Sequence, residues 1–173
     1  MSWFNRNNKE KVSRDQLAGI LYHFSKKFSA DYVSHEISKE DSPFKEADED
    51  VFTHERLIMI FWVIDAFFSD KERKLMALVH KHYFVDSGLI NDKESAKEEM
   101  ALIIRRYGEY HEAHNANAGV EQYLLGGVIA RNILQKERSE MNLLITSEIA
   151  MDITLLIKEI KESIFDKFEI IDQ

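Results

Sequence analysis

Histidine and carboxylate side chains gather between residues 109 and 114 in a pattern that suits a transition metal. The chain has no cysteine, so any such site must use imidazole and carboxylate ligands. His111 and His114 are three residues apart, which puts them on one face of a helix, and Glu109 is close in the sequence. These three residues are the candidate metal ligands. The competing explanation is that histidines near the carboxyl end of a helix favour its negative dipole and stay in solvent.

The sequence lacks the patterns that place catalytic groups at fixed spacing. None of its seven histidines follows an acid at the Glu-x-x-His spacing of carboxylate-bridged di-iron bundles, and no His-Glu-x-x-His zinc motif occurs. Phosphate-binding glycine loops, the dinucleotide-binding glycine pattern and the nucleophile elbow of hydrolases are also absent. We therefore expect no cofactor and a protein that is not an enzyme.

Asp65 is an acid inside the most apolar stretch of the chain, residues 57–68. A carboxylate buried there is costly unless it is paired. Arg105, Arg106 and Arg131 lie on neighbouring helical patterns and are the candidate partners. The alternatives are a structural ion pair, a helix rotation that exposes Asp65, and an acid with a raised pKa in a ligand-binding cavity.

Gly126 and Gly127 fall in the middle of a predicted helix. Two glycines there cost about 2 kcal/mol relative to alanines. Such a cost is usually offset by the close approach of another backbone, by a kink or by a ligand. We expect close helix packing, and we keep Gly126 and Gly127 with Asp65 as candidate ligand-binding residues.

Apolar residues recur every three to four positions through most of the chain, and this period predicts helices. The helices are expected over residues 13–33, 53–68, 69–88, 91–109, 120–135 and 139–168. Ser13 and Gln16 have the spacing of a capping box at the first helix start, and Gly88 suits the end of the third helix. Residues 57–68 are apolar on nearly all sides, so their helix should be central. The pattern predicts an all-α bundle of about six helices.

Length and composition fit one domain. The 173 residues are 45% hydrophobic with one proline and six glycines, which disfavours a turn-rich sandwich or barrel. We expect a single helical domain over residues 13–173, preceded by a flexible segment at residues 1–12. An acidic loop should interrupt the helices at about residues 38–51. From Glu40 to Asp50 there are six acids and one base, a net charge of -5 out of -8 for the chain.

Charge and hydropathy exclude several kinds of partner. A net charge of -8 argues against a nucleic-acid backbone as the main partner. The longest apolar run, residues 57–68, is shorter than the roughly 20 residues that a bilayer span needs. We do not expect membrane contact through Trp3 and Phe4, because a single lipid-contact signal binds only marginally. No secretory signal is evident, and the lack of cysteine suits the cytoplasm.

The chain carries more apolar surface than one stripe per helix buries. On the last predicted helix a second stripe of Leu144, Met151 and Leu155 predicts burial on two sides. Surplus apolar surface commonly marks a contact between subunits or with a partner. The candidate interface residues are Phe61, Trp62, Phe67, Phe68, Met141 and Leu144.

These observations favour a non-enzymatic interaction or regulatory module that forms a homodimer. A different protein partner could also cover the surplus apolar surface. The alternative is a helical bundle that binds a small molecule or a metal, with or without catalysis. That alternative would use Glu109, His111 and His114, or a buried Asp65.

Overall fold

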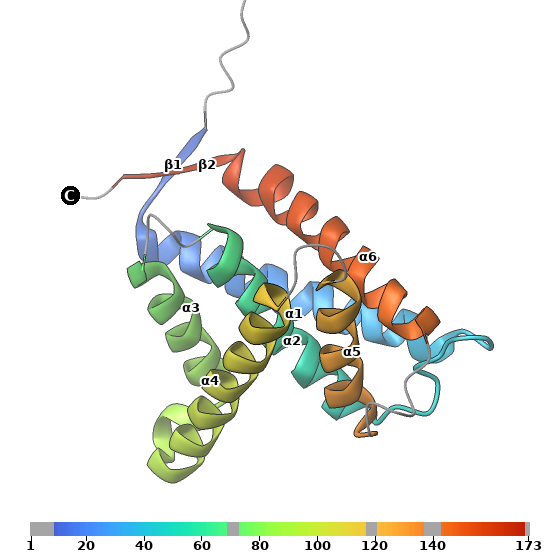
Figure 1. The fold of residues 1–173 in the computed structure, drawn as a ribbon. Coiled ribbons are helices and arrows are strands. Elements are labelled where there is room, and N and C mark those ends of the chain that lie inside the picture. The colour runs from blue at the N-terminus through green and yellow to red at the C-terminus, as the bar shows by residue number, and fades with distance from the viewer. Residues whose placement is uncertain (1–8, 69–72, 117–120, 137–142, 172–173) are drawn as a thin grey trace, which may run out of the picture.

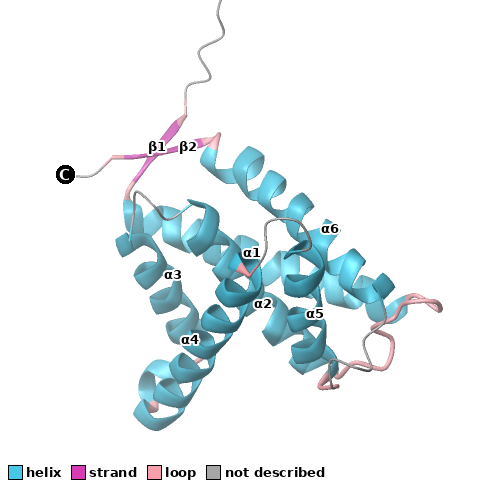
Figure 2. Ribbon diagram, viewed as in Figure 1, coloured by secondary structure: helices cyan, strands magenta, loops and turns pink. Residues whose placement is uncertain are grey.

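The protein is an all-α bundle in a computed structural model that describes residues 9–68, 73–116, 121–136 and 143–171. Helices make up nearly all of it, and strands occur only where the two ends of the described chain meet (Figure 2). The α-helices are α1 (Arg14–Ser38), α2 (Glu49–Phe68), α3 (Arg73–Asp86), α4 (Lys93–Asn115), α5 (Glu121–Leu134) and α6 (Leu143–Ile160). The shorter elements are β1 (Glu10–Val12), η1 (Leu89–Asn91), η3 (Lys161–Phe165) and β2 (Phe168–Ile170).

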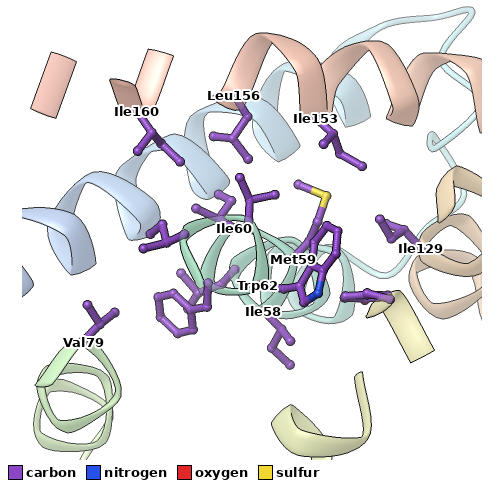
Figure 3. Close-up of a cluster of buried hydrophobic side chains, with 14 of the residues drawn as sticks. Ile58, Met59, Ile60, Trp62, Val79, Ile129, Ile153, Leu156 and Ile160 are labelled. Carbon is purple, nitrogen blue, oxygen red and sulfur yellow. The ribbon is translucent and has the colours of Figure 1, made fainter. Parts of the chain in front are cut away.

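Helix α2 is the centre of the bundle, as the apolar run predicts. Every side chain from Leu57 to Ile64 is buried, and α2 contacts α1, α3, α4, α5 and α6. In Figure 3 Leu156 and Ile160 of α6 point onto α2, and Val79 of α3 approaches it from the other side. Burying a side chain of this size stabilises the fold by about 2 kcal/mol. The bundle is therefore organised around one apolar rod.

The helix starts follow local capping chemistry. Ser13 and Gln16 form the predicted reciprocal capping box at the start of α1. Helix α2 starts four residues before the expected residue 53, because the Asp48 carboxylate accepts the backbone N–H of Val51 and ends the loop there. Gly88 follows α3 in the left-handed conformation, with φ 75°, as expected for a residue that stops a helix.

The last helix is shorter than predicted. Helix α6 ends at Ile160 and continues as a single π-helical turn, η3, whose Phe165 stacks on Phe68 of α2 with ring centroids 4.6 Å apart. Phe168, expected in the helix, instead begins the strand β2. Residues 139–142 of the predicted helix, and the predicted start of the third helix at residue 69, lie outside the described residues.

Strand β2 pairs with β1 in parallel, with Lys11 opposite Glu169. The backbone N–H of Glu10 donates to Lys167 at 2.7 Å, and the Lys9 ammonium donates to the Phe165 carbonyl at 2.6 Å. Hydrogen bonds to the other end of the chain therefore hold residues 9–12, which are part of the segment expected to be flexible. Residues 1–8, including Trp3 and Phe4, lie outside the described residues.

Candidate functional site

A buried ion pair fixes α6 on α2. Arg56 is 3% exposed, and its guanidinium donates two hydrogen bonds to Asp152, one of them from Nη2 to Oδ1 at 3.0 Å. The Arg56 Cζ atom lies 3.4 Å from the ring centroid of Tyr32, so the tyrosine covers one face of the cation. Burial raises the pKa of Tyr32, and the Asp152 charge adds to the rise. Because both charges are buried, neither helix can rotate without breaking the pair.

A second polar network joins α2, α4 and α5. Arg106 donates to Glu55, with Nη2 2.6 Å from Oε1 and Nε 2.9 Å from Oε2. Arg106 also donates to Glu109 at 3.1 Å, and the same carboxylate accepts from Arg131 at 3.2 Å and Asn132 at 3.0 Å. Burial alone would lower the pKa of Arg106, but the hydrogen bonds and charge of Glu55 outweigh it and raise that pKa.

The structure places the three predicted metal ligands in different surroundings. Glu109 accepts hydrogen bonds from three side chains, Arg106, Arg131 and Asn132, all at its Oε2 atom. The His114 ring packs against Trp62 and Phe67, with ring centroids 5.7 Å and 5.6 Å away, while His111 is exposed. No group of three histidines and acids in the described ranges is arranged to hold a metal ion. Glu109, His111 and His114 share a segment of sequence without converging.

Asp65 is half-buried near the end of α2 and acts electrostatically on two half-buried polar side chains. His80 of α3 and Tyr107 of α4 share a hydrogen bond of 3.0 Å. Burial lowers the pKa of His80, and the negative charge of Asp65 partly opposes that shift. Of the arginines expected near Asp65, Arg106 binds Glu55 and Arg131 binds Glu109. The charge of Asp65 thus acts on the hydrogen-bonded pair of His80 and Tyr107, which joins α3 to α4.

Gly126 lies directly against the backbone of α6. A Cβ atom at this position would stand 2.2 Å from the Thr146 carbonyl oxygen, which no real structure tolerates. The same atom at Gly127 would meet only the Thr146 methyl group, at an ordinary 3.5 Å. Gly126 therefore allows the close helix packing that we expected for the glycine pair.

A groove of about 280 Å³ lies between α4 and α5. It is lined by Glu109, Glu112, Ala113, Ala116, Leu124, Val128 and Arg131. Neither Asp65 nor the glycine pair belongs to it, so the structure does not join the predicted ligand-binding residues in this groove. Glu109 and Arg131 meet at its wall through their own ion pair.

A polar cluster around His54, which the sequence did not reveal, joins α2, α3 and α4. The His54 Nε2 atom lies 2.7 Å from Glu99 Oε1, and the Tyr83 hydroxyl donates to the same oxygen at 2.9 Å. The hydrogen bond to Glu99 raises the pKa of His54 above its ordinary value, although burial opposes the rise. Burial would raise the pKa of Glu99, but the hydrogen bonds from His54 and Tyr83 and the charge of His54 together outweigh it and lower that pKa.

The predicted interface residues divide into two groups. Phe61 and Trp62 are 0% and 1% exposed, so they belong to the core of the chain itself, which corrects their assignment to an interface. Phe68 packs on Phe165, and Phe67 is exposed beside His114. Leu144 is 72% exposed, while Met141 lies outside the described residues.

The exposed apolar surface is concentrated on α6. Leu144, Met151 and Leu155 are 72%, 61% and 65% exposed and follow one another at helical spacing. Glu148 and Lys158 are exposed on the same side. We call these five residues the α6 face. The stripe was expected to be buried on a second side of the helix, and within the described chain it is not. Figure 1 shows α6 along one edge of the bundle.

No protein-family model, curated protein or solved structure matches the chain. Among the described helices, none combines the length and the apolar character that crossing a bilayer requires.

Proposed function

We propose that this protein is a non-enzymatic interaction module that forms a homodimer through the α6 face. The observation that carries the proposal is the exposure of Leu144, Met151 and Leu155, each more than 60% accessible on one helix. Contiguous apolar side chains at the surface of a folded domain are typical of contacts with another protein. Burying a leucine or methionine side chain is worth about 2 kcal/mol, so pairing of two such faces gives a clear driving force.

The α6 face is also held rigidly, which favours association because little order must be gained on binding. The opposite side of α6 packs into the core through Ile149, Ile153 and Leu156. The Arg56–Asp152 ion pair fixes the rotation of the helix beside Met151. The close approach of Gly126 to Thr146 fixes its distance from α5.

Sedimentation velocity of the full chain at micromolar concentration tests the proposal. The wild-type chain should sediment with twice the monomer mass of 20.3 kDa. Leu155→Glu should give the monomer, because a charge replaces an apolar contact at the centre of the face. Ile104→Glu is the matched control, since Ile104 of α4 is 64% exposed but lies off the α6 face. A wild-type monomer, or a dimer lost equally in both variants, overturns the proposal.

A further inference from the structure

We infer that two copies of this chain pair with their α6 helices antiparallel, so that Met151 of each copy packs on Leu155 of the other and Glu148 of each faces Lys158 of the other. This inference rests on the proposed homodimer and adds its orientation and its charge contacts. It follows from the order of side chains along the α6 face and from the position of the acidic loop.

Four of the five residues of the α6 face are symmetric about position 153, whereas the counterpart of the fifth, Leu144, is Glu162. Met151 and Leu155 stand two residues on either side of that position, and Glu148 and Lys158 stand five residues on either side. A twofold axis through the outer side of the helix at residue 153 therefore opposes apolar with apolar and acid with base. Ile153 itself is buried in the core, so it leaves the axis clear.

The two charges select the antiparallel orientation. With the helices parallel and in register, Glu148 would face Glu148 and Lys158 would face Lys158, and like charges at a contact are unfavourable. With the helices antiparallel, the same side chains form two opposite-charge pairs. Lys158 is available for this role, because its contact with Glu162 is 4.0 Å long and both side chains are well exposed.

The acidic loop favours the same orientation. Its residues lie at the amino-terminal end of α6, where Glu148 and Asp41 both act electrostatically on Lys39 (Figure 1). From Glu40 to Asp50 the loop has a net charge of -5. Parallel pairing would bring two such loops to the same end of the dimer, where like charges are unfavourable. Antiparallel pairing separates them by the length of the helix.

Cysteine cross-linking tests the orientation cleanly, because the chain has no cysteine of its own. The full-length variants Met151→Cys and Leu155→Cys are oxidised separately and as an equimolar mixture. Antiparallel pairing puts residue 151 of one copy level with residue 155 of the other, while identical positions are offset by about 6 Å along the helix axis. We expect the mixed disulfide to form several-fold faster than either self-linked dimer, because a disulfide needs closely spaced Cα atoms.

Charge reversal provides the second, independent readout. Glu148→Lys and Lys158→Glu should each weaken dimerisation by about tenfold, and the double variant should restore it. In a parallel dimer the single reversals would be nearly neutral, because like charges merely replace like charges. The antiparallel pairing is overturned if one single-cysteine variant cross-links with itself faster than the mixture does, or if the single charge reversals do not weaken the dimer. Either result is still compatible with a homodimer. A wild-type chain that sediments as a monomer overturns the homodimer itself.

Discussion

The carbonyl oxygen of Thr146 lies 2.2 Å from the position that a Cβ atom on Gly126 would occupy, so α5 and α6 touch backbone to backbone at this point. Only glycine permits this approach, and the close packing of α5 on α6 offsets the low helix propensity of Gly126. The contact sets the distance between the helix that carries the α6 face and the rest of the bundle.

Gly126→Ala should therefore destabilise the protein by roughly 2 kcal/mol or more, since the neighbouring atom is backbone and cannot move aside. Gly108→Ala is the matched control. Gly108 lies in the middle of α4 with nothing within 4 Å of an added Cβ atom. It should raise the free energy of unfolding by about 1 kcal/mol through helix propensity alone. Urea unfolding of both variants measures the difference, and equal effects would contradict the close approach.

Asp152→Asn should lower the free energy of unfolding by about 3 to 5 kcal/mol, because it leaves the Arg56 cation buried without its counter-charge. Replacing both members, as in Arg56→Met with Asp152→Leu, should recover much of that loss, since no buried charge then remains. Thermal unfolding followed by circular dichroism compares the three proteins. If the single variant unfolds like the wild type, the pair does not hold α6 as described.

Leu155 and Leu156 are adjacent in sequence but 65% and 0% exposed. In the Met151→Glu background, which we expect to be monomeric, Leu155→Ala should change the free energy of unfolding by less than about 0.5 kcal/mol. Leu156→Ala should cost about 2 to 5 kcal/mol because it opens a cavity over α2. Chemical unfolding of this pair reports the rotation of α6. The opposite ranking would mean that the α6 face points inward.

The contributions of His54 and His80 to the free energy of unfolding should depend on pH in opposite directions. The pKa of His54 is raised above its ordinary 6.5, so its contribution is fully present below pH 6.5 and is lost as pH rises through the raised value. The pKa of His80 is lowered, so its contribution is present above pH 6.5 and is lost as pH falls.

Stability profiles of His54→Gln and His80→Gln between pH 5 and pH 9 check these signs. Relative to the wild type, His54→Gln should lose more stability on the acidic side, whereas His80→Gln should be relatively more stable there. Parallel curves for the two variants would refute the assigned environments of both rings.

Local signals in the sequence predicted most of the helices. The Ser13–Gln16 box, the apolar run from Leu57 to Ile64 and the stop at Gly88 depend on neighbours in the chain, and periodicity or capping chemistry reveals them. The start of α2 was misplaced because Asp48 competes with Thr53 as a cap and the loop geometry decides between them. Strand β2 was missed because its partner strand is at the other end of the sequence.

The candidate site was harder to predict because its contacts join distant residues. The partners of Glu109 include Arg131 and Asn132 on another helix, so its place in a polar network depends on residues more than 20 positions away. His54 and Glu99 are 45 residues apart. Composition alone cannot show that Phe61 fills the core while Leu144 faces outward.

The pairing of β1 with β2 also has a consequence for biosynthesis. The Lys9–Phe165 hydrogen bond beside it spans 156 residues, so β1 leaves the ribosome long before its partner is made. At ordinary translation rates the wait is roughly 8 to 30 s. Pairing of the two strands must therefore wait until the last described element of the chain has been made.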